Sequence, residues 1–324
     1  MSNGDARNVD EAGVAPEDIL RAAERIEGYV HRTPVLTSRL LDERAGCHLF
    51  FKCENLQRGG AFKARGAHNA VLSLPAQMRA AGVATHSSGN HGAALALAGA
   101  ALGIPAEIVI PSSAPAVKVD AVRAYGGRIH TCEPTLAARE ETLQRVCEET
   151  GAHFIPPYDH PAVIAGQGTC VLELADQIDP PDYLVTPVGG GGLLAGSAIA
   201  AGARWPGVKV IGAEPAGADD ARRGFRSGQW QPQTSPDTIA DGLRTSLGRL
   251  NYPLICRHVS DILCADDAAI IDAMRLIWTR TKLVVETSAA VTLAVVLTHR
   301  EMFAGRRVAL VLTGGNVDLD RLPW

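Results

Sequence analysis

The stretch Tyr183-Leu-Val-Thr-Pro-Val-Gly-Gly-Gly-Gly-Leu-Leu-Ala195 joins two apolar segments through four consecutive glycines. Tyr183 to Val188 predicts a buried strand, and Leu193 to Ala203 predicts a helix of small residues. Glycines let backbone N–H groups approach a ligand closely, and a helix N-terminus adds partial positive charge. The turn therefore predicts a phosphate cradle, with a flexible turn as the alternative. It lacks the Gly-Lys-Ser/Thr ending of a nucleotide P-loop and the GxGxxG spacing.

Outward from this turn, strand and helix patterns alternate along the chain. This order predicts right-handed crossovers and parallel sheets. We find no internal repeat of 20 to 50 residues and no low-complexity linker, so we expect two α/β units packed together with a cleft between them. The predicted strands are residues 48–53, 82–86, 106–110, 128–131, 183–188, 208–213 and 307–313. The predicted helices are residues 16–29, 62–74, 93–102, 116–125, 136–149, 193–203, 268–281 and 289–300.

Lys63 lies in the segment Gly59-Gly-Ala-Phe-Lys-Ala-Arg-Gly66, just after two glycines and at the start of a helical pattern. A lysine at a desolvated helix start can have a lowered pKa, which suits Schiff-base chemistry. Taken alone, a lysine in this position is more often an ordinary surface lysine.

Two more glycine-bearing turns follow predicted strands. Ser87-Ser-Gly-Asn-His-Gly92 offers successive N–H groups and polar side chains that could bind an anion such as a carboxylate, or could simply cap a helix. Thr313-Gly-Gly-Asn316 follows an apolar strand. In parallel sheets ligands bind outside the carboxyl ends of the strands, so three such turns together predict one site.

The composition of the chain argues against nucleic acid and membranes as partners. The 324 residues are 46% hydrophobic and 20% charged, with a net charge of −4, which favours a globular enzyme-sized core over nucleic-acid binding. No run of about 18 apolar residues predicts a membrane span, and no basic-then-apolar start predicts a secretory signal. The 7 cysteines are scattered and never spaced CxxC, so we expect reduced thiols and a cytoplasmic location.

Seven sequence blocks together resemble the serine/threonine dehydratase and serine racemase family of fold-type II pyridoxal-5′-phosphate (PLP) enzymes. The resemblance covers about residues 16 to 320, and its blocks occur in this order: ENLQ with AFKARGAHNA, SSGNHGAALALA, PPYDHPAVIAGQGT, PVGGGGLLAG, EPAGADD, TIADGL and LTGGNVDL. The resemblance implies two open twisted α/β domains with PLP in the cleft between them. Residues 1–52 and 152–324 would form the large PLP-binding domain and residues 53–151 the small substrate-binding domain.

The resemblance also implies roles for individual residues around PLP. Lys63 falls on the Schiff-base lysine, which also removes the α-proton, and Phe62 on the aromatic residue beside the ring. Asn90 matches the residue that binds the 3′-oxygen, and Thr313 the hydroxyl residue that faces the pyridine nitrogen. The remaining cofactor-binding positions are Gly189, Gly190, Gly191, Gly192, Leu193 and Glu286.

Substrate contacts are implied in the same way. Ser87, Ser88, Asn90 and His91 resemble the loop that holds the substrate carboxylate. Arg139 aligns with a second carboxylate contact of the racemases, although it could equally be a solvated helix arginine. Ser88 matches the racemase residue on the cofactor face opposite the lysine, where it would act as a second acid/base group.

The resemblance further implies a structural divalent-cation site and a homodimer. Glu214, Ala218 and Asp220 match the cation ligands, and two carboxylates with a backbone carbonyl suit Mg²⁺ or Ca²⁺. An acidic solvated turn is the alternative, and the neighbouring Asp219 has no assigned role.

The sequence thus predicts a PLP-dependent dehydratase that converts L-threonine, L-serine or a related β-hydroxy amino acid to a 2-oxo acid and ammonia. A 3-hydroxyaspartate or phenylserine dehydratase, a serine racemase, and a non-catalytic PLP-binding protein remain the alternatives. Two departures leave the substrate open: Ala61 stands where the family usually has serine, and Thr287 follows Glu286 where the family has proline.

Overall fold

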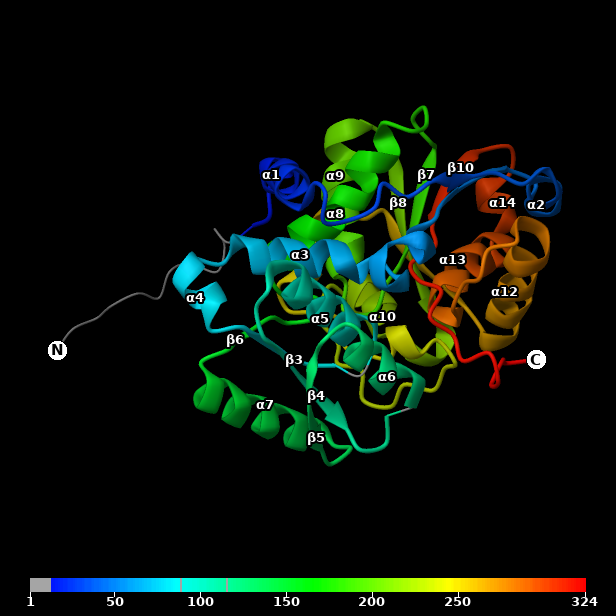
Figure 1. Cartoon of the computed structure of the whole chain (residues 1–324). Helices are drawn as coiled ribbons and strands as arrows, with labels where there is room; N and C mark the ends of the chain where they lie inside the picture. Colours follow the sequence, from blue (N-terminus) through cyan, green and yellow to red (C-terminus); the bar gives the residue numbers. More distant parts are fainter. Residues whose placement is uncertain (1–12, 88, 115) are drawn as a thin grey trace.

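The computed structural model describes residues 13–87, 89–114 and 116–324, and it contains two sheets with helices on both faces of each (Figure 1). The larger sheet has the strand order β1-β2-β10-β7-β8-β9, and only β1 and β2 pair antiparallel. Its strands are β1 (Val35–Leu36), β2 (His48–Lys52), β7 (Tyr183–Pro187), β8 (Lys209–Pro215), β9 (Asp261–Ala265) and β10 (Arg307–Val311).

The smaller sheet is entirely parallel, with the order β5-β4-β3-β6. Its strands are β3 (Val83–His86), β4 (Ala106–Pro111), β5 (Arg128–Cys132) and β6 (His153–Phe154). Strand β6 was not predicted, and it pairs with β3 although it lies beyond residue 151, where we placed the end of the small domain. The predicted domain bounds otherwise stay a prediction.

Apolar side chains pack the helices onto both faces of each sheet. On the larger sheet, one core joins the strands to α2 (Arg39–Ala45), α12 (Asp267–Thr281) and α13 (Thr287–Thr298). The opposite core joins them to α1 (Pro16–Ile26), α8 (Pro161–Ala175), α9 (Gly192–Arg204) and α11 (Asn251–His258). On the smaller sheet, α3 (Lys63–Ser73), α5 (Asn90–Leu102) and α6 (Ala116–Ala124) share one core, and α7 (Leu136–Thr150) packs on the other face.

The shorter elements complete the chain and connect these layers. They are α4 (Ala76–Ala80), α10 (Asp220–Ser227), α14 (Arg300–Phe303), and the 3₁₀ turns η1 (Glu54–Leu56), η2 (Arg58–Gly60), η3 (Ala216–Ala218) and η4 (Asp241–Leu243).

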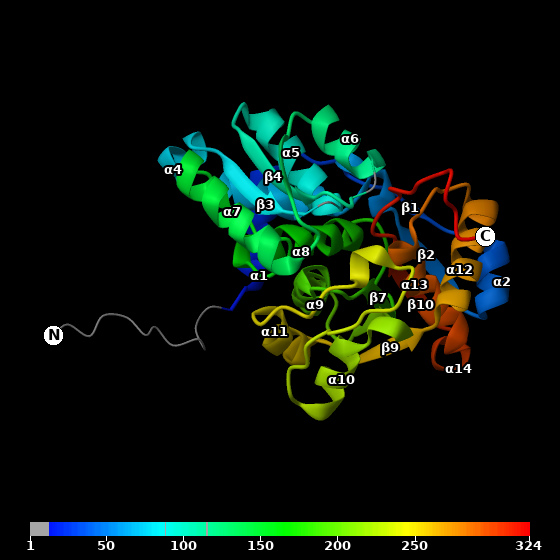
Figure 2. The same ribbon diagram turned by 90° about the horizontal axis from the view of Figure 1, so that it is seen from below.

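Helix α8 lies between the two sheets in the view from below (Figure 2), and α3 packs against it. Their close approach depends on two glycines. A Cβ on Gly66 would overlap the Gln167 side chain, and a Cβ on Gly166 would lie 2.7 Å from the Gly66 Cα. Any larger residue at either position would push the helices apart and widen the space between the sheets.

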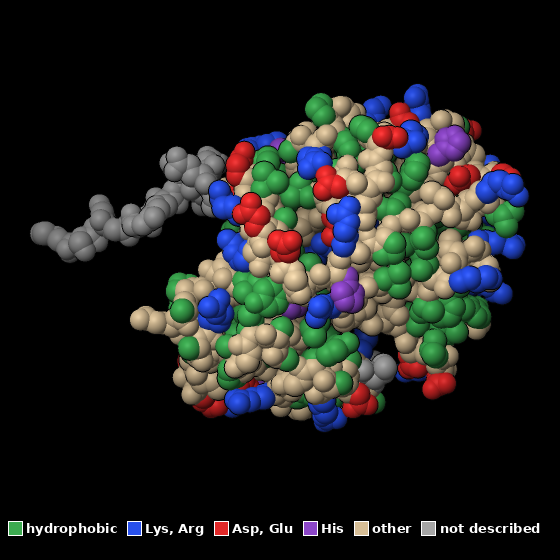
Figure 3. Space-filling model, turned by 45° about the horizontal axis from the view of Figure 1, so that its top comes forward, with side chains coloured by type: hydrophobic (Ala, Val, Ile, Leu, Met, Phe, Trp, Pro, Cys, Tyr) green, Lys and Arg blue, Asp and Glu red, His purple; other side chains and the backbone are tan. Residues whose placement is uncertain are grey.

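The two-sheet architecture agrees with the predicted α/β fold class. None of the helices in the described parts of the chain is long and apolar enough to cross a membrane. On the face seen in Figure 3, basic and acidic side chains are interspersed rather than gathered into patches of one sign.

Candidate functional site

Lys63 is the first residue of α3 and lies where the chain leaves the turn η2. Its Nζ donates a hydrogen bond of 2.6 Å to the carbonyl oxygen of Pro157 and lies 5.0 Å from the centre of the Phe62 ring. Burial lowers the pKa of Lys63 to about 8, although the carboxylate of Glu286 opposes the shift. An amine with such a pKa is available as a nucleophile or a base near neutral pH, as the sequence predicts for a Schiff-base lysine.

The four glycines connect β7 to α9, as the pattern predicts. Gly191 has φ of 89°, a conformation that favours glycine, and α9 begins one residue later. The first N–H groups of a helix have no partner within the helix, so this buried turn presents donors to an anion. The predicted phosphate-binding residues that line the turn are all buried: Gly189, Gly190, Gly191, Gly192 and Leu193.

Tyr158, which the sequence analysis did not single out, covers this turn. A Cβ on Gly190 would overlap the Tyr158 ring, and a Cβ on Gly192 would lie 2.9 Å from the Tyr158 carbonyl oxygen. The ring therefore lies directly against the glycine turn, and the Thr245 hydroxyl is the hydrogen-bond neighbour of the phenol. Burial raises the pKa of Tyr158, so the phenol stays protonated at neutral pH.

The residue after Tyr158 anchors this segment. The Asp159 carboxylate accepts hydrogen bonds from the backbone N–H groups of Arg249, Leu250 and Asn251 at 2.9 to 3.3 Å, at the start of α11. The Asn251 amide in turn donates to the Gly190 carbonyl oxygen at 2.6 Å. The glycine turn is thus held from outside by side chains that lie far from it in sequence.

Asn90 and Glu286 meet at the centre of the site. The Asn90 amide nitrogen lies 3.0 and 3.2 Å from the two Glu286 carboxylate oxygens, and the Asn316 amide donates to Asn90 Oδ1 at 2.9 Å. Burial, reinforced by the charge of Asp241, raises the pKa of Glu286 to about 7. Near neutral pH the Glu286 carboxyl is therefore protonated in about half of the molecules. The protonated form can donate a hydrogen bond, and the ionised form can only accept one.

The start of α5 carries the predicted carboxylate-binding loop. The Ser87 hydroxyl accepts from the Gly89 N–H at 3.3 Å, and α5 begins at Asn90. His91 is fully buried, with Nε2 3.0 Å from the Ile155 carbonyl oxygen and no partner for Nδ1 among the described residues. Burial lowers the pKa of His91 to about 3, so its ring is neutral. Ser88 lies outside the described residues, so its predicted roles are left as they stand.

Thr313 lies just beyond β10 and joins the third turn to the Lys63 segment. Its carbonyl oxygen accepts a hydrogen bond of 2.9 Å from the Phe62 N–H, and Ala61 forms a β-bridge with Gly314. The lysine turn is therefore bonded directly to the Thr313 turn, and Asn316 of the latter is bonded to Asn90 after the Ser87 turn, so the structure brings three of the predicted turns together.

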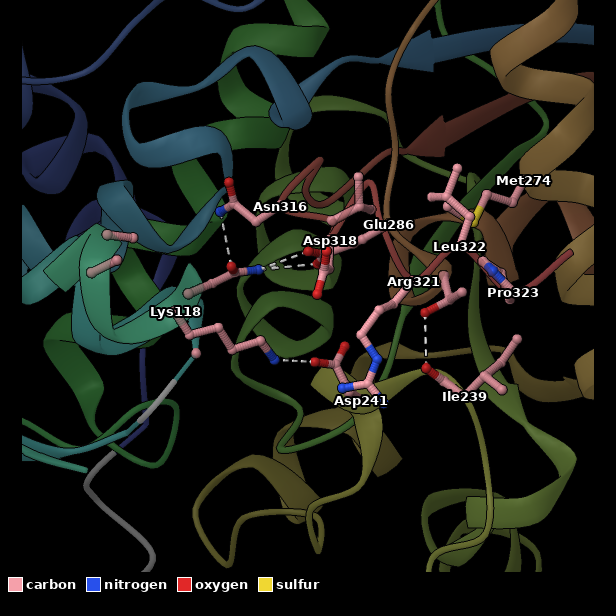
Figure 4. Close-up of a pocket in the computed structure, with 16 residues that line it drawn as sticks. Lys118, Ile239, Asp241, Met274, Glu286, Asn316, Asp318, Arg321, Leu322 and Pro323 are labelled. Carbon is pink, nitrogen blue, oxygen red and sulfur yellow. Dashed lines mark hydrogen bonds and ion pairs between the residues drawn. The ribbon is translucent and has the colours of Figure 1, made fainter. Parts of the chain in front are cut away.

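Beside these turns opens a cleft of about 510 Å³, lined among others by Asn90, Glu286 and Asn316. Figure 4 shows Lys118 of α6 reaching across it to an ion pair with Asp241 of η4. This pair links the smaller-sheet unit to the larger one at the edge of the site, and the sequence analysis did not foresee it. Asp241 lies in the block TIADGL, but the resemblance assigns no role to it or to Lys118.

Arg139 is half-buried in the first turn of α7. Its Nε donates to the Thr135 carbonyl oxygen at 3.3 Å. It contributes, after burial, to lowering the pKa of His86, the last residue of β3 before the Ser87 turn. The arginine thus stands near the carboxylate loop without contacting it.

The predicted cation ligands lie together at the end of β8. Glu214 is buried and accepts hydrogen bonds of 2.9 Å from the N–H groups of Ala221 and Arg222, while Asp220 accepts one of 2.8 Å from Leu247. Burial raises the pKa of both carboxyls, that of Asp220 to about 6. Ala218 ends the 3₁₀ turn between them. No third acidic, His or Cys ligand joins them within the described ranges.

Comparisons with known proteins agree with this arrangement. A family model described as pyridoxal-phosphate dependent enzyme matches residues 26–314. A β-hydroxyaspartate dehydratase of Paracoccus denitrificans is 51% identical over 95% of this chain and 98% of its own length. An L-threo-3-hydroxyaspartate ammonia-lyase of Saccharomyces cerevisiae is 46% identical over 94% of both chains. The solved structure of maize serine racemase superposes with a TM-score of 0.92 at 44% identity, over 95% of both chains.

Proposed function

The chain belongs to the family of pyridoxal-phosphate-dependent enzymes, and on that premise we propose that it is a dehydratase of 3-hydroxyaspartate. It is a PLP-dependent enzyme of the hydroxy-amino-acid lyase type, as the sequence predicts. The proposal selects one substrate from the β-hydroxy amino acids that the sequence leaves open. It rests on the 51% identity to a β-hydroxyaspartate dehydratase over nearly the whole of both chains. The products are a 2-oxo acid and ammonia.

The residues present fit PLP. The glycine turn Gly189–Gly192 with Leu193 offers N–H donors for the phosphate, and Thr313 would face the pyridine nitrogen. Asn90 would bind the ring oxygen, and Glu286 lies against Asn90. When bound there, PLP supplies an electron sink for the pair left at the substrate Cα.

Lys63 carries the proton transfer. Its lowered pKa leaves a useful fraction of neutral amine at physiological pH, which can remove the α-proton as a general base. The Cβ–O bond then breaks as the electron pair at Cα forms the Cα–Cβ double bond. The hydroxyl takes up a proton and leaves as water, and no proton returns to Cα. The start of α5, with Ser87, Asn90 and His91, would hold the α-carboxylate through helix N–H groups and a neutral imidazole.

A second carboxylate distinguishes 3-hydroxyaspartate from serine and threonine. His86 is the last residue of β3, just before the α-carboxylate loop, and Arg139 in the first turn of α7 is near enough for its charge to lower the pKa of His86, after burial. We assign this basic pair to the β-carboxylate. Hydrogen bonds to charged groups contribute roughly 1.5–3 kcal/mol, enough for about a 10- to 100-fold preference for a dicarboxylate.

Serine racemisation is the second candidate, because the maize serine racemase superposes over 95% of both chains. Inversion at Cα needs a second acid/base group on the face opposite Lys63, the role that the resemblance gives to Ser88. A Ser88→Ala variant should lose L-to-D conversion while keeping much of the L-dehydration. A variant that racemises normally would remove Ser88 from this role.

We also propose that Glu214, Asp220 and the Ala218 carbonyl bind Mg²⁺ or Ca²⁺. Support comes from two buried carboxylates whose pKa values are raised by burial. The charge of Asp220 further raises the pKa of Glu214, and the charge of Asp219 raises both pKa values, which a cation would offset. The homodimer and the cytoplasmic location stay predictions.

The test is a substrate panel with the stereoisomers of 3-hydroxyaspartate, L-threonine, L-serine and D-serine, in which 2-oxo acid, ammonia and enantiomer are measured in one reaction. We expect kcat/KM to be highest for a 3-hydroxyaspartate. Arg139→Gln should raise KM for that substrate at least about tenfold and for serine much less. A higher kcat/KM for serine or threonine than for every 3-hydroxyaspartate isomer would refute the substrate proposal.

A further inference from the structure

A buried chain of charged side chains begins two residues after Lys63. The Nε and Nη2 atoms of Arg65 each donate a 2.8 Å hydrogen bond to a different carboxylate oxygen of Glu54. The side chains are 1% and 0% exposed, so this two-pronged pair is fully sealed from water. Burial alone would raise the pKa of Glu54, but the Arg65 charge holds it below its usual value. The pair is therefore ionised throughout the physiological range.

The chain continues through Glu173 to Lys52. Arg65 Nη2 donates to one Glu173 oxygen at 3.1 Å, and Lys52 Nζ donates to the other at 2.5 Å and to the Thr33 carbonyl oxygen at 2.8 Å. The four charges alternate and sum to zero. They come from α3, η1, α8 and β2, so the network binds the first turn of α3 to the larger sheet and to α8.

Stability alone is a weak reason for such a network. Taking an ion out of water costs several kcal/mol, and replacing a buried ion pair with well-packed apolar residues is often neutral or stabilising. A guanidinium fork, however, fixes direction as well as distance, because its planar donors match a carboxylate in one orientation only. Because Arg65 belongs to α3, the orientation of its fork on Glu54 fixes how α3 is rotated about its own axis.

The position of Lys63 follows from that rotation. On one side of Lys63, the Phe62 N–H is bonded to the Thr313 carbonyl oxygen at 2.9 Å. On the other side, Arg65 is held by Glu54 and Glu173. The Lys63 backbone is therefore clamped on both sides, and only its side-chain torsions remain free to move between the cofactor and the substrate.

We propose that Arg65 is a positioning residue for Lys63: its fork onto Glu54 sets the rotation of α3 and thereby the reach of the lysine amine. The proposal rests on the role proposed for Lys63 but not on any particular substrate. A displacement of about 1 Å of a reacting group can cost on the order of 100-fold in rate. Loss of the fork should therefore lower turnover while leaving the binding sites for substrate intact.

The first variant is Arg65→Lys in the holoenzyme, which keeps the charge but cannot form the fork. We expect kcat to fall by about tenfold or more, with KM within about threefold of wild type. The visible circular dichroism per bound cofactor should fall at least about twofold, because that signal reports how firmly the attached ring is held. The dichroism needs no substrate, so it separates failure of this proposal from failure of the proposed function.

The second variant, Arg65→Met with Glu54→Met, removes both charges and leaves the neutral Lys52–Glu173 pair. It should melt near wild type yet keep the low kcat and the weak dichroism. Arg128→Lys is the matched control, since Arg128 pairs with buried Glu107 in the smaller sheet at 3.1 Å, and it should change neither. Wild-type kcat and dichroism in either Arg65 variant, or an equal loss in the control, would overturn the proposal.

Discussion

The Nζ of Lys63 donates a 2.6 Å hydrogen bond to the Pro157 carbonyl oxygen, immediately before the tyrosine that covers the glycine turn. The amine that is to hold the cofactor's aldehyde carbon thus lies beside the cradle proposed for its phosphate. The groups around this contact allow three predictions, about Lys63, Glu286 and Tyr158, and a fourth concerns the separate cation site.

The first prediction concerns how pH controls cofactor attachment. Burial lowers the pKa of Lys63 to about 8, and only the neutral amine attacks an aldehyde. The rate at which the apoprotein couples covalently to PLP should therefore rise about tenfold for each pH unit below 8 and level off above it. Stopped-flow absorbance measures this rate. A midpoint near 10, the value of an ordinary lysine, would mean that Lys63 is not desolvated.

The second prediction concerns Glu286. Its folded pKa of about 7 exceeds its ordinary value of 4.5, so between these pH values the folded state retains a proton that the unfolded state has lost. The stability of the apoprotein should therefore fall as pH rises through this window. Glu286→Gln should flatten that slope, and it should also lower the attachment midpoint of Lys63, because the carboxylate raises the lysine pKa. Urea unfolding at several pH values measures the slope, and a variant with the wild-type slope would contradict the assignment.

The third prediction concerns Tyr158. Tyr158→Ala removes the wall against Gly190 and should weaken PLP binding about tenfold or more, with a loss of roughly 2–4 kcal/mol in unfolding free energy. Tyr158→Phe removes only the hydroxyl near Thr245 and should change PLP affinity less than about threefold. Tyr252→Phe is the control, since its hydroxyl bonds to Gly224 away from the turn. Equilibrium PLP titration of the apoproteins is the assay, and wild-type affinity in Tyr158→Ala would show that the ring does not shape the cradle.

The fourth prediction concerns the cation site. Mg²⁺ or Ca²⁺ should raise the melting temperature of the wild type, because a cation that binds only the folded state stabilises it, by about 2.7 kcal/mol at 100 times Kd. Asp220→Asn should abolish that rise. Asp219→Asn should keep it, because Asp219 is paired with Arg223 at 2.8 Å. Chelator addition with calorimetry checks both, and a wild-type rise that survives in Asp220→Asn would exclude Asp220 as a ligand.

The sequence predicted those parts of the site that are encoded locally. The strand, glycines and helix around Gly191 lie within one stretch, and so do Lys63 after η2 and Thr313 after β10. Helix α5 begins at Asn90, earlier than the predicted Ala93, because polar residues form its first turn after Gly89. The last residues of the predicted carboxylate-binding loop, from Asn90 on, therefore also form the N-terminus of the helix.

The parts that were missed depend on contacts distant in sequence. Helix α8 was not predicted, because most of its own residues are buried. It therefore has no polar face, and its sequence lacks the alternation of apolar and polar residues that reveals a helix. Arg65 lies inside a quoted motif, but its partner Glu173 is 108 residues away. Likewise, the Tyr158 ring is placed on the glycine turn by Asp159 and α11, and no local pattern reports that contact.

Borohydride trapping tests whether Lys63 is the residue that carries the cofactor. The purified holoenzyme is reduced with borohydride, digested, and mapped by mass spectrometry. We predict that the reduced PLP adduct lies on the peptide containing Lys63, and that Lys63→Ala yields no adduct and no elimination activity. An adduct on another lysine, or unchanged turnover in Lys63→Ala, would contradict the account.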